Sequence, residues 1–336
     1  MDGMLARLEA SAGNGYCPDA APMTPPTAGL GHTGVMAEHG EHSKAPKGAN
    51  AVKVGEILRV GAGRVRLADH DPAGTPGYPG KGKKDAPAFT AAIVPELADL
   101  QERLYAAGVA DRVGAPSVLL VLQGMDTSGK GGVIRHVAGL VDPQGVALKA
   151  FKAPTPTERE HDFLWRIRAA LPRPGMIGVF DRSHYEDVLV ARVDGLAPPD
   201  EVEARYEQIN EFEAEVAAAG TVIVKCMLHI SAEQQRRRLL ARLDNPAKHW
   251  KYNPGDVDVR LKWPAYQEAY ELALARCNTD VAPWHVVPSD HEWYRNWAIA
   301  RLLRDALAGL GLGWPKAGYD VAVERARVEA AEVVTR

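Results

Sequence analysis

The sequence has 336 residues, of which 46% are hydrophobic and 25% charged, as in an ordinary globular protein with one large domain or two small ones. Its formal net charge of −3 argues against a general nucleic-acid binder. The three cysteines are widely separated and form no CxxC pair, which disfavours a disulfide scaffold or structural zinc and fits a reducing cytoplasm. No apolar run is long enough for a signal peptide or a membrane span, so we expect a soluble cytoplasmic protein.

The N-terminal segment 1–50 has few large apolar residues and many Gly, Pro and Ala residues. Such a chain cannot bury enough surface to offset its conformational entropy, so we predict that it is mostly disordered. A metal-binding tract is the alternative to a solvated tail, and its candidate ligands are His32, Glu38, His39, Glu41 and His42. The stretch Val52–Leu67 indicates a short strand or an embracing arm, and the Pro- and Gly-rich Asp69–Lys84 indicates a loop.

A helix and then a buried strand are predicted next. Apolar residues recur at helical spacing from Phe89 onward, with Pro95 expected to break or kink the run. The Val- and Leu-rich run Ser117–Gln123 is typical of a strand buried on both faces of a parallel sheet. The chain then turns abruptly at Gly124–Lys130, GMDTSGK, and continues as a helical pattern to about Leu140.

The segment GMDTSGK matches G-x-x-x-x-G-K, the pattern of a phosphate-binding loop. Its glycines let successive N–H groups point into one concavity, the following helix adds its positive end, and Lys130 supplies a cation. The next residue is usually Ser or Thr, whose hydroxyl binds Mg²⁺, but here it is Gly131. A metal would need other oxygens, and Asp126 is the nearest candidate. A Gly-rich turn with a chance lysine is the alternative that the flanking strand and helix disfavour.

Beyond the loop, strand and helix patterns alternate. Further strands are predicted at Gly145–Phe151, Gly175–Phe180, Thr221–His229 and Pro283–Val287. A helix over Glu158–Leu171 is expected to begin at a capping box formed by Thr157 and Glu160. Together with the central strand, this alternation predicts an α/β fold with a parallel five-stranded sheet flanked by helices.

An acidic residue, Asp181, follows the strand that ends at Phe180, at the sheet edge where open α/β proteins bind ligands. Phosphate-loop enzymes use an aspartate at this place to hold Mg²⁺, so Asp126 and Asp181 predict a two-carboxylate metal site. The neighbouring Arg182 is suited to bind phosphate oxygens with both arms of its guanidinium group. A helix N-cap is the structural alternative for Asp181.

One-sided charge marks the segment Arg236–Lys262, which holds eight basic residues against three acidic ones. Asn245–Pro246 and Asn253–Gly255 interrupt it, so we predict two helical pieces joined by a loop, where phosphate-loop kinases carry a lid. Such a lid excludes water and brings arginines to the charge that develops during transfer. A solvated charged face is the alternative, although the interleaved Trp250 and Trp263 disfavour it.

Four segments resemble, in order, the polyphosphate kinase 2 family: GMDTSGKGG at 124–132, FDRSHYEDVLV at 180–190, RLLARLDNPAKHWKYNPGDVDVRLKWPAYQEAY at 238–270 and APWHVVPSDHEWYRNWAIARLL at 282–303. The resemblance runs from about Val54 to Leu312. It implies a thymidylate-kinase-like fold with a helical lid. It also implies reversible, Mg²⁺-dependent transfer of a terminal phosphoryl group between inorganic polyphosphate and AMP or ADP, with guanine nucleotides as further candidates. We expect a homo-oligomer, a dimer or a tetramer, with no nucleic-acid or membrane partner.

The site residues implied by this resemblance and by the motifs fall into three groups. The catalytic residues are Asp126, Lys130, Asp181, Arg182, Arg238 and Arg242, of which Asp126 and Asp181 also hold the metal. The phosphate-binding residues are Gly124, Met125, Thr127, Ser128, Gly129, Gly131 and Arg135. The nucleotide and lid residues are Tyr185, Lys248, Trp250 and Lys251. Three basic residues are candidates for lining a channel that binds polyphosphate: Arg135, Lys149 and Lys152. The alternative is that they are ordinary surface charges.

We expect a kinase domain over 54–316 with its lid at about 233–262, an N-terminal extension over 1–53 and a tail helix over 317–336. Two other functions stay open. An ATP-dependent nucleoside or nucleotide kinase would ordinarily carry Ser or Thr in place of Gly131, and a non-catalytic polyphosphate-binding protein would gain nothing from the carboxylates. A GTPase is disfavoured because the sequence has no N-K-x-D motif. The choice between a mono- and a diphosphate acceptor, the base preference and the direction of the reaction also stay open.

Overall fold

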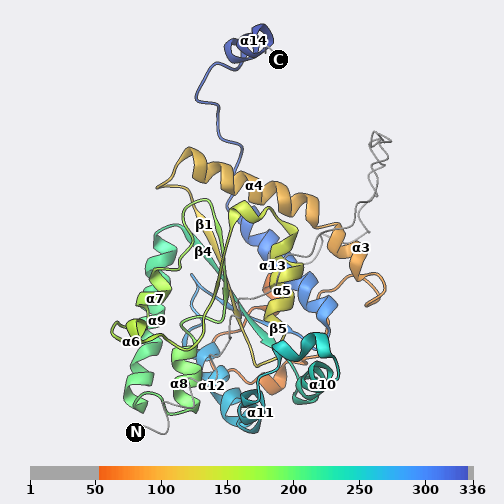
Figure 1. Ribbon diagram of the computed structural model, residues 1–336, viewed down its shortest axis with the longest axis vertical. Helices are drawn as coiled ribbons and strands as arrows, with labels where there is room; N and C mark the ends of the chain where they lie inside the picture. The colour runs from red at the N-terminus through yellow and green to blue at the C-terminus, as the bar shows by residue number, and fades with distance from the viewer. Residues whose placement is uncertain (1–52, 332–336) are drawn as a thin grey trace, which may run out of the picture.

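The computed structural model describes residues 53–331, so the predicted disordered segment and its histidines lie outside the described residues. The sheet has five parallel strands in the order β2-β3-β1-β4-β5 (Figure 1). They are β1 (Ser117–Gln123), β2 (Val146–Ala150), β3 (Ile177–Asp181), β4 (Thr221–His229) and β5 (Trp284–Pro288). The α/β fold predicted from the sequence is confirmed, and each predicted strand lies within two residues of its expected bounds.

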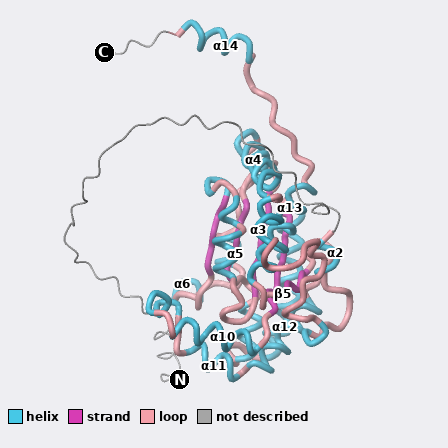
Figure 2. The backbone as a smooth tube through the Cα atoms, turned by 90° about the vertical axis from the view of Figure 1, so that its right-hand side faces the viewer, coloured by secondary structure: helices cyan, strands magenta, loops and turns pink. Residues whose placement is uncertain are grey.

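Helices pack against both faces of this sheet (Figures 1 and 2). In chain order they are α2 (Val54–Leu58), α3 (Ala86–Ala91), α4 (Val94–Ala110), α5 (Lys130–His136), α6 (Pro156–Arg159), α7 (Trp165–Arg168), α8 (Glu186–Val193), α9 (Pro199–Ala218), α10 (Ala232–Leu243), α11 (Gly255–Leu261), α12 (Trp263–Arg276), α13 (Glu292–Gly309) and α14 (Val321–Ala330).

Two hydrophobic cores follow from the alternation of side chains along β1, which is buried along its whole length. Leu119 and Val121 belong to a core shared with α8, α9 and α12, whereas Leu120 and Leu122 belong to a core shared with α4, α5 and α13. Because both faces are covered, apolar side chains are needed at successive positions rather than at alternate ones. This explains the continuous Val and Leu run that identified the central strand.

The helices before and after β1 differ in part from their predicted extents. The expected break at Pro95 is present: α3 ends at Ala91, and Pro95 lies in the first turn of α4, where proline costs no hydrogen bond. Helix α5 ends at His136 rather than near Leu140, and a 3-10 turn over Ala138–Leu140 follows it. The stretch predicted as a strand or an arm begins instead with the short helix α2, which packs against α13 and β5.

The capping box lies two residues earlier than predicted. Thr155 Oγ1 accepts a hydrogen bond from Glu158 N at 3.2 Å, and Glu158 Oε2 accepts one from Thr155 N at 2.8 Å. The prediction of Thr157 and Glu160 as the capping pair is therefore wrong. Both pairs have the same spacing and residue types, and Pro156 favours the earlier start because proline suits the first position of a helix.

The continuous helix predicted over Glu158–Leu171 is also wrong. The structure has two short helices, α6 and α7, with an irregular turn between them. In that turn Asp162 Oδ1 accepts a hydrogen bond from Leu164 N at 2.9 Å. A short polar side chain that bonds its neighbouring backbone offers the chain an alternative to continuing the helix.

The C-terminal tail leaves the body after α13 and ends in α14, which stands clear of the other helices in both views (Figures 1 and 2). No residue of α14 is buried. The start of the tail contacts α4, where the guanidinium carbon of Arg103 lies 5.9 Å from the centroid of the Trp314 ring. Over residues 53–331, no helix is long and apolar enough to cross a membrane.

Candidate active site

The phosphate loop, Gly124–Lys130, connects the carboxyl end of β1 to the first turn of α5. Gly124 and Gly129 have φ angles of +148° and +108°, which side-chain-bearing residues rarely adopt. A Cβ atom at Gly124 would lie 2.7 Å from the carbonyl oxygen of Leu228, and one at Gly129 would overlap the guanidinium group of Arg295. Both glycines of the motif are therefore required by the backbone conformation and by the space around it.

Two arginines bind carbonyl oxygens of the loop. Arg238 on α10 donates to Thr127 O at 2.8 Å and to Ser289 O at 2.7 Å, and Arg295 on α13 donates to Ser128 O at 3.2 Å. Arg295 is 1% exposed, and burial lowers the pKa of its guanidinium group to about 10, so it is still charged at neutral pH. The loop is thus held between α10 and α13 by two cations, which favour an anion in its concavity.

The amine of Lys130 spans the loop. It is nearly buried, and its Nζ donates to the carbonyl oxygen of Gly124 at 2.8 Å. Burial lowers the pKa of this amine and the charge of Arg182 lowers it further, while the carboxylates of Asp126 and Asp181 raise it. Lys130 therefore interacts electrostatically with all three side chains. Oxygens of a bound phosphate would compete with the carbonyl oxygen of Gly124 for hydrogen bonds from its ammonium group.

Arg182 links the loop to the end of the neighbouring strand. Its Nη2 lies 2.9 Å from Asp126 Oδ1, and its Nη1 lies 3.8 Å from Glu186 Oε2. The β1–β3 register pairs Leu122 with Asp181, which brings the two segments together at the carboxyl ends of their strands. The pKa of Arg182 is raised, chiefly by Glu186 and also by Asp126. Four of the predicted catalytic residues therefore share one edge of the sheet: Asp126, Lys130, Asp181 and Arg182.

Two hydroxyl groups in the loop have unused hydrogen-bonding capacity. Thr127 Oγ1 and Ser128 Oγ are buried and have no hydrogen-bond partner among the described residues. Hydroxyls without a protein partner in a glycine-rich loop suit a ligand that brings its own oxygens. The remaining predicted loop residues, Met125 and Gly131, are buried and exposed respectively, and a Cβ at Gly131 would meet no atom within 4 Å.

The predicted lid consists of α10, the 3-10 segment η4 (Pro246–Lys251) and α11. It lies at the end of the molecule opposite to α14 (Figures 1 and 2). Arg242 Nη1 donates to Lys251 O at 3.0 Å and to Asp256 Oδ2 at 3.2 Å, so it ties α10 to η4 and α11. The lid residues predicted to reach the nucleotide are exposed: Lys248, Trp250 and Lys251.

Tyr185 does not lie where a nucleotide contact was predicted. Its side chain is 0% exposed, and its hydroxyl donates to Glu213 Oε1 at 2.9 Å inside the core. The prediction that Tyr185 contacts the nucleotide is therefore wrong, because an enclosed ring presents no surface to a substrate. The three candidate channel residues are exposed: Arg135 lies on α5, Lys149 on β2 and Lys152 just after β2.

Three residues beside the site were not predicted. Glu186 pairs with Arg182 four residues earlier, a helical spacing that could have identified it. Gln235 Nε2 donates to Asp126 O at 3.2 Å, and Arg295 binds the loop from α13. Neither of these two had a local signal, because each lies more than 100 residues from the loop that it contacts.

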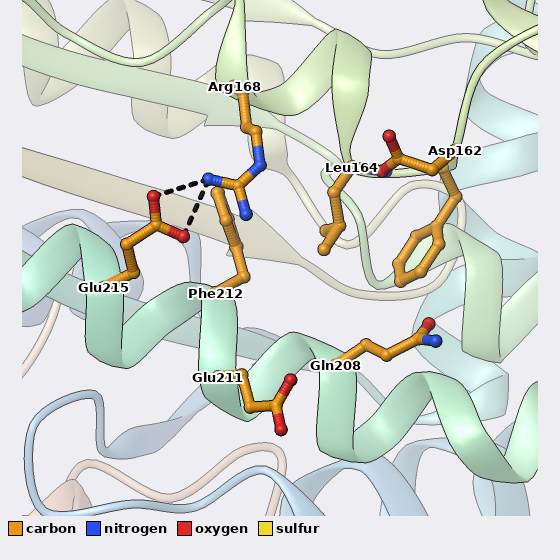
Figure 3. A pocket seen from close by; sticks show the side chains of 8 residues that line it. Asp162, Leu164, Arg168, Gln208, Glu211, Phe212 and Glu215 are labelled. Atoms are coloured by element: carbon orange, nitrogen blue, oxygen red, sulfur yellow. Dashed lines mark hydrogen bonds and ion pairs between the residues drawn. The ribbon is translucent and has the colours of Figure 1, made fainter.

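A separate surface hollow of about 290 Å³ lies between α7 and α9, and Figure 3 shows residues that line it. An ion pair spans it, with Arg168 Nη1 2.8 Å from both carboxylate oxygens of Glu215. The ring of Phe212 lies beneath this guanidinium group, 4.9 Å from its carbon. None of the predicted site residues lines the hollow, so it is distinct from the phosphate loop.

A parallel sheet with a glycine-rich loop after its central strand, and the consecutive residues Asp181 and Arg182 at the end of the neighbouring strand, define a phosphate-loop phosphotransferase. The family model of polyphosphate kinase 2 matches residues 82–310, and the chain belongs to this family. The resemblance of the four sequence segments is thereby confirmed, and the protein is a kinase of this family.

Relatives match over most of the chain. The AMP/ADP-polyphosphate phosphotransferase of Meiothermus ruber is 45% identical over 254 residues, which cover 76% of this chain and 92% of the relative. The ADP-polyphosphate phosphotransferase of Rhodopseudomonas palustris is 38% identical over 239 residues, which cover 66% and 79%. The crystal structure of polyphosphate kinase 2 from Arthrobacter aurescens is similar to this structure with a TM-score of 0.80 and 53% identity, covering 84% of this chain and 98% of that one.

Proposed function

We propose that the protein transfers a terminal phosphoryl group between inorganic polyphosphate and adenine nucleotides, with AMP, ADP or both as acceptors. The names of the relatives support this reaction, because both act between polyphosphate and adenine nucleotides. The observation that carries the proposal is the meeting of Lys130, Asp126 and Arg182 at the phosphate loop. Guanine nucleotides as acceptors and the reverse reaction belong to the same proposal.

The arrangement of charge suits phosphoryl transfer. The transition state is loose and highly anionic, so positioning and charge neutralisation supply most of the catalysis. A nucleotide phosphate oxygen is already ionised at neutral pH, so the site needs no strong general base. Lys130 from α5 and Arg182 from the end of β3 bring cations from two separate elements to one place. We assign to both the neutralisation of charge on the transferring group.

Asp126 and Asp181 are the residues that would hold Mg²⁺. Carboxylate oxygens suit this ion, which commonly combines one or two of them with substrate phosphates and water. Over residues 53–331, no three His, Cys, Asp or Glu side chains form a metal-binding group, so substrate oxygens and water would complete the ligand set. The unpaired hydroxyls of Thr127 and Ser128 leave polar atoms in the same loop for the bound phosphate. When bound, Mg²⁺ would neutralise phosphate oxygens that Lys130 does not reach.

Binding of the polyphosphate chain needs further cations beyond the loop. We assign it to exposed basic side chains on the lid, on α5 and at and after β2: Lys248, Lys251, Arg135, Lys149 and Lys152. Exposed positive charges attract a polyanion without fixing a single register. Since exposed charges are screened by salt, this part of the affinity should fall as ionic strength rises.

The direct test is to incubate the purified protein with Mg²⁺ and polyphosphate and supply AMP, ADP, GMP or GDP in separate reactions. We expect ADP or ATP to form from the adenine nucleotides, and none when polyphosphate or the metal is left out. ATP formation from ADP at the same rate without polyphosphate would refute the proposal.

Two control reactions separate the alternatives. An ATP-dependent nucleoside or nucleotide kinase would phosphorylate its acceptor with ATP as donor and would ignore polyphosphate. A non-catalytic polyphosphate-binding protein would retain labelled polyphosphate on a filter and form no nucleotide product.

A further inference from the structure

A buried ion pair joins β4 to α9. Lys225 is 0% exposed and Glu213 is 1% exposed, and Lys225 Nζ lies 2.5 Å from Glu213 Oε2. The same ammonium group donates to the hydroxyl of Tyr185 at 2.8 Å and to the carbonyl oxygen of Cys277 at 2.7 Å. A lysine has three protons to donate, so every one of them has an acceptor here.

The second oxygen of the carboxylate connects this pair to the segment that follows β3. Glu213 Oε1 accepts a hydrogen bond from the Tyr185 hydroxyl at 2.9 Å and lies 3.3 Å from His184 Nε2. Two successive residues of that segment are thus attached to one buried carboxylate. We call Lys225, Glu213, Tyr185 and His184 the buried network.

Stability alone gives little reason for such a network. Removing two charges from water is costly, and apolar replacements of buried ion pairs are often as stable or more stable. The attested benefit of a buried pair is that it selects one conformation of the groups bound to it. The question is therefore which conformation this network selects.

The conformation in question is that of Arg182. Its φ of +64° is unusual for a residue with a side chain, so the surrounding structure must hold it. Tyr185 lies at the N-terminus of α8 directly before Glu186, whose carboxylate faces Arg182 at 3.8 Å. Because Tyr185 is the residue directly before α8 and is attached to the core, the backbone between Arg182 and α8 has a buried anchor at this position.

We propose that Lys225 and Glu213 are positioning residues of the phosphoryl-transfer site. Through the hydroxyl of Tyr185 they set the conformation of residues 181–186, which keeps the guanidinium group of Arg182 at the phosphate loop beside Asp126. Both side chains are fully enclosed, so they would act through Tyr185 and not by binding substrate. The inference rests on the proposed function, in which Arg182 neutralises the transferring group.

The sharpest variant is Tyr185→Phe, which removes the connecting hydroxyl and keeps the ring. We expect kcat to fall about tenfold, within the range seen for groups that orient a site residue, with little change in KM for the nucleotide. The matched control is Tyr206→Phe: Tyr206 is 1% exposed on α9, and its hydroxyl has no partner among the described residues. This control should keep wild-type kcat and KM.

A double-mutant cycle with Arg182→Lys separates positioning from general destabilisation. If the network acts through Arg182, Tyr185→Phe should lower kcat much less in the Arg182→Lys background than in the wild type. Losses that multiply, or a wild-type kcat in Tyr185→Phe, would overturn the inference. Should Tyr185→Phe not fold, the double change Lys225→Met with Glu213→Leu, which removes both buried charges together, is measured in the same cycle and judged by the same criterion.

The two proposals fail in different ways. The wild-type reaction with polyphosphate tests the proposed function alone. The positioning inference is judged only from the ratios of variant to wild-type kcat, with whichever phosphoryl donor the wild type uses.

Discussion

At the residue scale, backbone strain gathers at the two carboxylates proposed to hold the metal. Thr127 and Arg182 are the non-glycine residues with positive φ in the described part of the chain, at +65° and +64°. Each directly follows one of these carboxylates, Asp126 or Asp181. Such conformations cost about 1–3 kcal/mol each and persist where the surrounding structure holds them. We therefore attribute the strained backbone to the orientation of the Asp126 and Asp181 side chains.

The first prediction concerns those carboxylates. Asp126→Asn and Asp181→Asn should each nearly abolish turnover while the fold stays intact, because each change removes a negative oxygen from the proposed metal site. Activity is measured over a range of Mg²⁺ concentrations, and circular dichroism checks the fold. A wild-type rate in either variant at ordinary Mg²⁺ would remove that residue from the site.

The second prediction concerns Gly129. Gly129→Ala should destabilise the fold by about 1–2 kcal/mol through the left-handed backbone, and by more through overlap with Arg295. Most of the activity should be lost too, because the loop must shift. Denaturant unfolding and the polyphosphate assay measure the two effects. Gly139→Ala is the control, since its Cβ would lie 3.9 Å from the nearest atom; equal effects of the two changes would contradict the prediction.

At the scale of elements, α10 has two different attachments along its length. Its first two turns are tied to the phosphate loop, through Gln235 to Asp126 O and through Arg238 to Thr127 O. Its end is tied to α11 of the predicted lid through Arg242 and Asp256. A movement of the lid would therefore act on the loop through one helix, which is how a lid couples closure to the arrangement of the site.

The third prediction separates chain binding from chemistry in the lid. If Arg242 acts in the transition state, Arg242→Ala should lower kcat and kcat/KM together, by about tenfold to a thousandfold. If it only helps to hold polyphosphate, KM should rise with kcat unchanged, and added salt should mimic the change. Steady-state kinetics at two ionic strengths distinguishes these cases. Unaltered kcat and kcat/KM would show that the lid has been assigned to the wrong segment.

Arg238→Ala is the comparison for this prediction. The guanidinium group of Arg238 donates to loop carbonyls and to the carbonyls of Ser289 and Asp290, so its loss should reduce both kcat and stability. Arg238→Lys should restore little of either, because one ammonium group cannot reproduce a planar fork of donors.

At the scale of the whole molecule, the phosphate loop lies where several elements distant in sequence meet. The loop follows the central strand, Arg238 reaches it from α10, and Arg295 reaches it from α13. Helix α14 takes no part in this arrangement in the described residues 53–331, where none of its residues is buried, and the family match ends at residue 310.

The fourth prediction follows from this separation. Ending the chain after Lys316 removes α14 and should change the free energy of unfolding by no more than about 0.5 kcal/mol, with activity unchanged. Ending it after Ala308 is the matched control, because it removes Leu310 and Leu312, which pack against the core, and should destabilise the fold. Thermal unfolding and the polyphosphate assay compare the two. A large loss in the shorter deletion would mean that α14 has a function in the enzyme.

The sequence by itself determined the parts whose physics is local. The apolar run Ser117–Gln123 and the glycine pattern after it identified the central strand and the phosphate loop, because burial on both faces and positive φ each demand particular residue types. The alternation of strand and helix patterns along the chain predicted the α/β fold class, because each pattern is set by the residues of its own segment. Local patterns failed where two starts were nearly equivalent, as at the capping box that begins at Thr155.

Only the tertiary structure decided which distant side chains meet. Pairing of β1 with β3 brings Arg182 to Asp126 across 56 residues, and Arg295 reaches the loop from 167 residues away. Tyr185, expected at the nucleotide, is buried instead beside Lys225 and Glu213. Helical or strand periodicity shows which face of an element is buried, but the partner on that face depends on strand order, register and packing. These arise from the whole chain, so no single segment could show them.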